Sequence, residues 1–170
     1  CCLANPPFMT PKWGIKPHNR FSVKSNRSEV LFVDYIMDHL KTNGKAWIII
    51  PEGVIFQSAN AYKQLRKKMI EEDYLWGVVS LPWGVFNPYA WVKTSILLFD
   101  KSIAPKTNKI VFIKVDNDWY GLWAQRKPID KNDLPNVLKT LISYKEAIKS
   151  DIVPVVDWNS LIVVDKSKIA

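Results

Sequence analysis

Four consecutive residues near the start of the chain, Asn5-Pro6-Pro7-Phe8, have side chains that together suit one kind of chemistry. An exocyclic amine on a heterocyclic base is a weak nucleophile, because its lone pair is delocalised into the ring. Two acceptors aimed at its two hydrogens, the Asn5 side-chain oxygen and the Pro6 carbonyl, would favour the pyramidal, more nucleophilic nitrogen. The two prolines stiffen the turn, and Phe8 offers a flat surface on which a base can stack. The residues therefore predict chemistry at the amino group of a nucleobase, with a purely structural Pro-Pro turn as the alternative.

The charge of the chain points to a polyanionic partner. The chain carries a net charge of +8, and residues 1–28 contain five basic side chains and no acidic one. Most of this segment, residues 9–28, has no helical or strand period and reads as a long loop beside the Asn-Pro-Pro-Phe tetrad. We predict that these side chains contact the phosphates of a nucleic acid; the alternative is a solvated loop. They are Lys12, Lys16, Arg20, Lys24 and Arg27.

Helix-like and strand-like segments alternate along the rest of the chain, which is typical of an α/β fold built on a parallel sheet. The tetrad follows a short strand at residues 1–4, and ligands of such sheets bind at the carboxyl ends of strands. Ser28 is placed to cap the first helix. Strands are expected at residues 45–50, 75–81, 92–99, 110–115 and 161–164, the first of them buried on both faces, and helices at residues 29–41, 60–72 and 134–149.

Several motifs occur in a specific order after the tetrad. They are Ile50-Pro51-Glu52-Gly53-Val54-Ile55-Phe56, Leu65-Arg66-Lys67-Lys68, Leu81-Pro82-Trp83-Gly84-Val85-Phe86, the block from Thr94 to Lys101, and later Arg126-Lys127-Pro128 and Asn132-Asp133-Leu134-Pro135. With the tetrad, this series resembles the adenine-specific DNA N6-methyltransferases, most closely the modification subunit of type I restriction-modification systems.

The resemblance implies the later half of a Rossmann-like methyltransferase sheet, mixed with one antiparallel strand (residues 92–99) inserted between those at 45–50 and 75–81. Residues 1–101 would form the C-terminal half of the catalytic domain, and residues 102–170 an extension. The implied activity is methyl transfer from S-adenosylmethionine to adenine N6 in double-stranded DNA, with the adenine flipped out of the helix. Asn5, Pro6, Pro7 and Phe8 would be catalytic, and Phe8 and Phe86 would stack on the two faces of the adenine.

The resemblance also implies a specificity subunit and a second modification subunit as partners, and a location in the prokaryotic cytoplasm. The family binds its cofactor in a Gly-rich turn that precedes the tetrad. The six glycines of this chain form no such turn, so we expect a fragment of the catalytic domain that is inactive alone. The alternatives are methylation of RNA or of a protein glutamine, and a non-catalytic DNA-binding or assembly module.

Composition excludes several other classes. No apolar run approaches the roughly 18 residues of a membrane span, and the first residues have no signal-peptide pattern. The two cysteines, Cys1 and Cys2, are neighbours, and with His18 and His39 they make no convincing metal site. Core packing is expected for Trp83, Tyr89 and Trp91, and a solvated helix face for residues 63–68.

Overall fold

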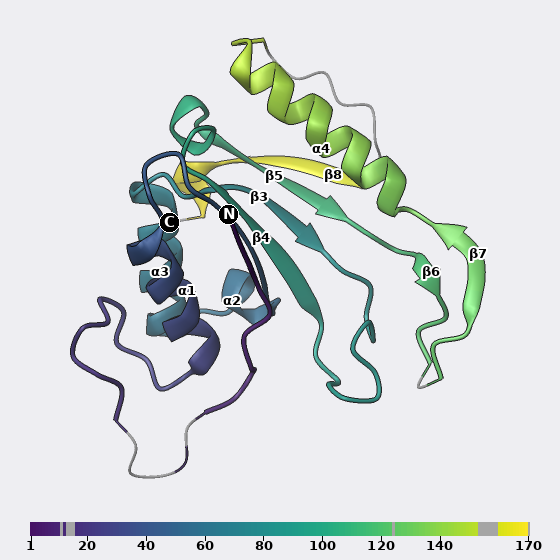
Figure 1. Ribbon diagram of the computed structural model, residues 1–170, viewed down its shortest axis with the longest axis horizontal. Coiled ribbons are helices and arrows are strands. Elements are labelled where there is room, and N and C mark those ends of the chain that lie inside the picture. The colour runs from purple at the N-terminus through teal and green to yellow at the C-terminus, as the bar shows by residue number, and fades with distance from the viewer. Residues whose placement is uncertain (11, 13–15, 124, 153–159, 170) are drawn as a thin grey trace.

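A six-stranded mixed sheet in the order β1-β2-β4-β3-β5-β8 forms the centre of the molecule. The computed structural model describes residues 1–170 except 11, 13–15, 124, 153–159 and 170. Helices α1 and α3 cover one face of the sheet and α4 the other (Figure 1). The strands are β1 (Cys2–Ala4), β2 (Lys45–Pro51), β3 (Leu75–Ser80), β4 (Thr94–Asp100), β5 (Lys109–Lys114), β6 (Asp118–Tyr120), β7 (Pro128–Asn132) and β8 (Leu161–Asp165). The helices are α1 (Ser28–His39), α2 (Gly53–Phe56), α3 (Asn60–Glu71) and α4 (Leu134–Lys149), and short 3₁₀ turns lie at Ala104–Lys106 and Lys166–Lys168.

Strand β4 runs antiparallel between β2 and β3, which confirms the predicted insertion. The neighbouring pairs β1–β2 and β3–β5 are parallel. The prediction of one antiparallel strand was incomplete, because β8 also pairs antiparallel with β5. An apolar run such as that of β8 carries no sign of its direction. The sheet thus continues beyond residue 101, where we expected the catalytic half to end.

The core consists of two apolar layers, one on each face of the sheet. Alternate residues of β4 serve the two layers: Leu97 and Phe99 face α1 and α3, and Leu98 faces α4. This period of two is what an extended strand imposes. The layer under α4 is narrower, and Trp47 on β2 remains 48% exposed. The prediction that this strand is buried on both faces was therefore wrong, because Trp47 borders an open apolar hollow beside α4 and is not packed against the helix.

The segment between β5 and α4 contains a two-stranded antiparallel ribbon, β6–β7, that sequence analysis did not predict. Its strands are short, β7 begins with a proline, and neither alternates between polar and apolar residues. The ribbon projects away from the sheet on the same side as the loops that follow β1 and β3 (Figure 1). No helix in the described part of the chain is long and apolar enough to cross a membrane.

A buried ion pair joins α1, α3 and the loop of residues 9–28. The Asp34 carboxylate is fully buried and lies 2.7 Å from Lys68 Nζ, which is 12% exposed and also 2.7 Å from Asp38. Asp34 also accepts hydrogen bonds from the backbone N–H of Ser22 (2.8 Å) and Val23 (3.3 Å) and from Ser22 Oγ (2.6 Å). The second half of the loop is thereby attached to both helices.

The expectation of a solvated helix face at residues 63–68 was wrong for two of its four basic residues. Arg66 is buried and donates hydrogen bonds to the carbonyls of Val54 (2.9 Å) and Gln57 (3.0 Å). Lys68 is in the ion pair described above. Lys63 and Lys67 are exposed, as predicted. The four share one stretch of α3, and only their position around the helix separates the buried pair from the exposed pair.

Replacement of Lys68 by methionine is expected to lower the free energy of unfolding by roughly 3 kcal/mol, because it leaves the Asp34 carboxylate buried without a cation. The matched control is Lys67→Met, which removes only an exposed pair with Glu71 and costs less than about 0.5 kcal/mol. Chemical denaturation of the native protein and of the two variants measures both changes in the free energy of unfolding. Equal losses in the two variants would contradict the anchoring role.

The pH dependence of this difference follows from two pKa shifts. Burial alone would raise the pKa of Asp34, but hydrogen bonds from Lys68, Ser22 and Val23 outweigh it and hold that pKa below 3.8. Burial alone would lower the pKa of Lys68, but Asp34 and Asp38 hold it above 10.5. A depressed carboxyl pKa gives stability that is lost as the pH falls through it, and a raised lysine pKa gives stability that is lost as the pH rises through it. The Lys68→Met difference is therefore expected to be largest around neutral pH and to shrink in stronger acid or base.

Candidate functional site

The Asn5-Pro6-Pro7-Phe8 tetrad directly follows β1, at the edge of the sheet where β1, β2, β3 and β5 have their carboxyl ends. Parallel pairing of Ala4 with Ile48 fixes the level at which the tetrad leaves the sheet. The Asn5 side chain is exposed, Pro6 is buried and Phe8 is half-buried. The first proline therefore packs against the protein, whereas Asn5 remains accessible to a ligand, as its predicted role requires.

Ser28 attaches the tetrad to the start of α1. Its hydroxyl donates to the carbonyl of Pro7 or to that of Met9 (2.8 Å) and accepts the Met9 N–H (3.1 Å), and the Ser28 N–H donates to the Met9 carbonyl (3.0 Å). We predicted Ser28 to cap the helix, but it is the first helical residue and Arg27 occupies the N-cap position without a side-chain cap. The hydroxyl therefore holds the two ends of the 9–28 loop together.

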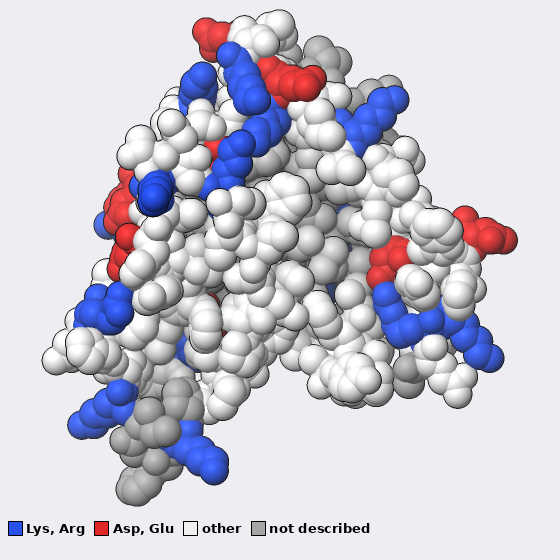
Figure 2. Space-filling model, in the orientation of Figure 1, with Lys and Arg blue, Asp and Glu red and all other residues white. Residues whose placement is uncertain are grey.

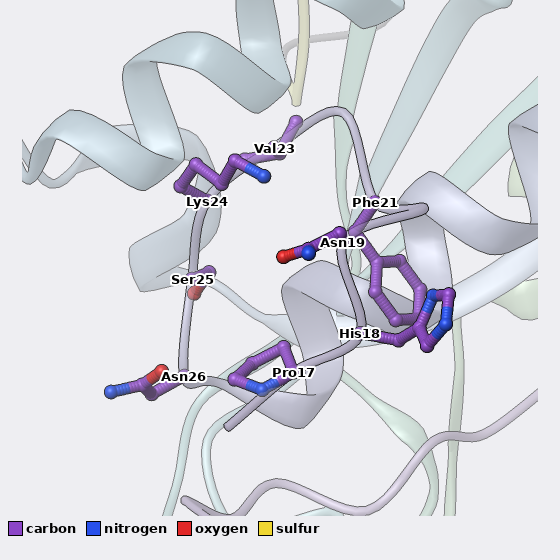
Figure 3. Close-up of a pocket in the computed structure, with 8 residues that line it drawn as sticks. All are labelled: Pro17, His18, Asn19, Phe21, Val23, Lys24, Ser25 and Asn26. Atoms are coloured by element: carbon purple, nitrogen blue, oxygen red, sulfur yellow. The ribbon is translucent and has the colours of Figure 1, made fainter.

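Within that loop, residues 17–26 curve around a hollow of about 310 Å³. Figure 3 shows Asn19 and Lys24 reaching into this hollow from opposite sides of the curve. Val23 is buried beneath it. Residues 11 and 13–15 of the loop lie outside the described part of the chain.

The five basic side chains predicted to contact phosphates are all exposed, but they do not point to one place. The Arg20 guanidinium lies over the Tyr35 ring (4.8 Å to the centroid) and 3.4 Å from His39 Nε2, towards the end of α1 that is remote from Ser28. Eleven helical steps separate the two ends, about 16 Å. Arg27 lies 3.8 Å from the buried carboxylate of Glu29.

The remaining three basic residues of the loop are Lys12, Lys16 and Lys24, and they form no ion pair among the described contacts. Cations without an internal partner are the ones best able to meet phosphates. The contacts therefore favour these lysines over Arg20.

Phe86 lies in the loop between β3 and β4, at the same edge of the sheet as the tetrad. It is half-buried, and backbone bonds from the N–H groups of Tyr89 (2.8 Å) and Ala90 (3.0 Å) to its carbonyl fold the loop around it. Strands β1 and β3 are three strand spacings apart in the sheet, about 14 Å. A base held by both Phe8 and Phe86 therefore needs the two loops to lean towards each other.

A polar group at this edge that sequence analysis missed links the ends of three strands. Glu52, after β2, accepts a hydrogen bond from Ser80 Oγ at the end of β3 (2.6 Å), and Lys93 Nζ, before β4, lies 3.2 Å from the same oxygen. The Glu52 N–H also donates to the Lys93 carbonyl (2.9 Å). These contacts fix the end of the β3–β4 loop that leads into β4. The sequence could have indicated this group, because each of the three residues lies near the end of a predicted strand.

The aromatic residues around Phe86 do not pack in the core, and our expectation for them was wrong. Trp83, Tyr89 and Trp91 are all exposed. Tryptophan and tyrosine are commonly buried, so composition alone favoured the core. The loop is held instead by its own backbone bonds and by the Glu52 contacts. No group of three or more potential metal ligands occurs among the described residues.

The chain is similar to known DNA methylases over nearly its whole length. The sequence model of the family described as N-6 DNA Methylase matches residues 1–162. Among curated proteins, the chain is 36% identical over 100 residues to the type I restriction enzyme EcoEI methylase subunit of Escherichia coli, covering 58% of the chain and 20% of that protein. It is 26% identical over 105 residues to the EcoKI methylase subunit of Escherichia coli K12, covering 62% and 19%. The chain thus spans about a fifth of the length of these relatives.

Solved structures give the same result for the fold. A chain from a study of assembly and conformational transition in a type I restriction-modification system superposes with a TM-score of 0.80 at 25% identity, covering 98% of this chain and 34% of the other. The methyltransferase subunit of a type I system from Streptococcus thermophilus gives a TM-score of 0.65 at 24% identity with the same coverage.

Replacement of Ser28 by alanine is expected to loosen the tetrad without unfolding the sheet. The Met9 N–H and the Pro7 carbonyl lose their side-chain partner, at about 1 kcal/mol for each hydrogen bond. Amide exchange at Met9 in the native protein is then expected to be about 5 to 30 times faster. Ser25→Ala, which removes only the acceptor of the Arg27 N–H within the loop, is the control and leaves Met9 unchanged. Unaltered exchange in Ser28→Ala would rule out the closing role of the hydroxyl.

Proposed function

The chain belongs to the N-6 DNA methylase family, and from that premise we propose that it forms the base-binding side of an enzyme that methylates N6 of adenine in DNA. The observation that carries the proposal is the exposed Asn5 at the carboxyl end of β1, held from behind by buried Pro6 and by the Ser28 contacts. The chain spans only about a fifth of its curated relatives, so the activity of the whole protein is part of the proposal.

Asn5 and Pro6 would act as two fixed hydrogen-bond acceptors. The Asn5 side-chain oxygen and the Pro6 carbonyl would each accept one hydrogen of the adenine amine, which localises its lone pair on N6. Because the sheet and Ser28 hold the turn in place, the acceptors need no reorganisation when the base arrives, and this is where fixed dipoles contribute most to catalysis.

The target adenine would leave the DNA helix to reach these acceptors, as enzymes acting on a base atom require. Phe8 would stack on one face of the adenine and Phe86 on the other. The half-buried state of both residues supports this role, since each keeps part of its surface accessible to a base. The exposed lysines of the 9–28 loop would contact the phosphates of the flipped strand.

The methyl donor implied by the family is S-adenosylmethionine, which supplies the methyl group. The described residues do not by themselves fit this cofactor. Two glycines follow strands, but they form no Gly-rich turn: Gly53 stands alone before α2, and the backbone at Gly84 is already packed against the Leu122 carbonyl, which an added Cβ would approach to 2.9 Å. We therefore propose that the donor is held by a part of the protein outside residues 1–170.

The names of the relatives support further partners. They are methylase subunits of type I restriction enzymes, so we propose that the protein assembles with a specificity subunit and a second modification subunit and acts on DNA in the prokaryotic cytoplasm.

Asn5→Ala in the native protein is expected to lower adenine methylation by two to three orders of magnitude, the usual effect of losing one preorganised hydrogen bond in a transition state (about 10² to 10³). DNA affinity is expected to change little. Asn19→Ala, an exposed amide of the adjacent loop, is the matched control. Methylation near the parental rate in Asn5→Ala would refute the role of this residue, and transfer to RNA or glutamine in place of adenine would refute the substrate.

Neutralising Lys12 and Lys16 to glutamine is expected to flatten the log–log dependence of DNA affinity on salt by roughly 1.8 units, about 0.9 for each phosphate that the protein no longer neutralises. Arg20→Gln is the internal control. Its guanidinium is held on α1, so the slope stays unchanged. If the double lysine variant also keeps the parental slope, the loop is a solvated segment and these lysines make no phosphate contacts.

A further inference from the structure

Exposed aromatic rings gather on two segments at the edge of the sheet that carries the tetrad. Tyr89 is 93% exposed and Trp123 is 85% exposed. Single exposed rings are common, but a group of them on neighbouring segments is typical of an interaction surface. We call the set the aromatic ridge; it comprises Trp83, Tyr89 and Trp91 of the β3–β4 loop and Trp119, Tyr120 and Trp123 of the β6–β7 ribbon.

The two segments of the aromatic ridge are in direct contact. The Asn87 side-chain nitrogen donates to the Leu122 carbonyl (3.1 Å). Gly84, with φ of +83°, lies so close to this carbonyl that an added Cβ would be 2.9 Å from it. The position of the ribbon is therefore coupled to the loop that carries Phe86. A partner that touches the ridge lies beside a base held by Phe86.

The charge around the ridge is balanced. Arg126 pairs with Asp118 and lies 5.4 Å from the Tyr120 ring centroid. Exposed Asp130 and Lys131 offset each other, and Lys127 is exposed near the turn. The β6–β7 ribbon forms the lobe at the right of Figure 2, where basic side chains lie at the lower end and acidic ones above them. A hollow separates this lobe from the basic loop at the lower left (Figure 2).

We propose that the aromatic ridge stacks on unpaired bases of the DNA beside the flipped adenine. The inference rests on the proposed function, because DNA that places an adenine at Asn5 must pass along this edge. Flipping one base leaves its partner and its neighbours with free faces, and flat, exposed side chains fit those faces. A nearly neutral ridge binds through these rings rather than through phosphates, which distinguishes it from the 9–28 loop.

The test compares two DNA duplexes that differ in one position next to the target adenine, paired in one and unpaired in the other. The native protein is expected to prefer the unpaired duplex. The double variant Tyr89→Ala/Trp123→Ala is expected to lose about 5- to 150-fold in affinity for it, the range for one stacked base. Its salt slope stays parental, because stacking releases no counterions. Tyr89→Phe/Trp123→Tyr keeps flat faces and restores the affinity.

The readouts separate this proposal from the proposed function. If the parental protein neither binds DNA nor methylates adenine, the proposed function itself is refuted. Parental methylation with unchanged affinity of the double alanine variant would overturn the ridge alone. Loss of subunit assembly in sedimentation, with unchanged DNA affinity of the assembled complex, would also overturn it and would assign the rings to a protein interface.

Discussion

The insertion of β4 between β2 and β3 is the constraint on which the arrangement of the site depends. An antiparallel strand in this position begins at the edge where its parallel neighbours end. The connection from β3 to β4 is therefore a loop that stays at this edge, with no helix between the two strands. Backbone bonds on both sides and alternate burial of Leu97, Leu98 and Phe99 in the two core layers hold β4 in place. The Phe86 loop and the Glu52 contacts therefore lie at the same edge as the tetrad, which the parallel pairing of β1 with β2 places there.

Each loop at this edge is attached by a different buried or half-buried polar group. Ser28 holds the tetrad, the pair of Asp34 and Lys68 holds the far half of the 9–28 loop, and Glu52 holds the end of the β3–β4 loop. On the other face of the sheet, Lys145 of α4 lies 2.6 Å from the buried carboxylate of Asp100. Ser28, Glu52 and Asp100 lie at the ends of elements, whereas Asp34, Lys68 and Lys145 lie within helices. Directional bonds from these groups fix positions that apolar packing alone leaves loose.

The fold was predictable from the sequence where periodicity was strong. The helix expected at residues 134–149 has those bounds, and the strands at 45–50, 75–81 and 92–99 agree within two residues. The tetrad stood out because its residue types combine rarely. The β6–β7 ribbon, the buried state of Arg66 and the exposure of Trp83, Tyr89 and Trp91 were not predictable, because they depend on which surfaces meet in three dimensions. A single run of residues does not record that.

The contact between Met9 and Ser28, which joins the two ends of the 9–28 loop, has a consequence for how such a protein changes over evolutionary time. Because the Met9 N–H donates to the Ser28 hydroxyl and the Ser28 N–H donates to the Met9 carbonyl, the two ends of the loop stay together. The cost of closing a loop grows only slowly with its length, so the residues between Met9 and the part that Asp34 holds at Ser22 and Val23 are free to lengthen, shorten or change in charge while the tetrad stays in place. This segment can therefore diversify between lineages without a matching change in the tetrad.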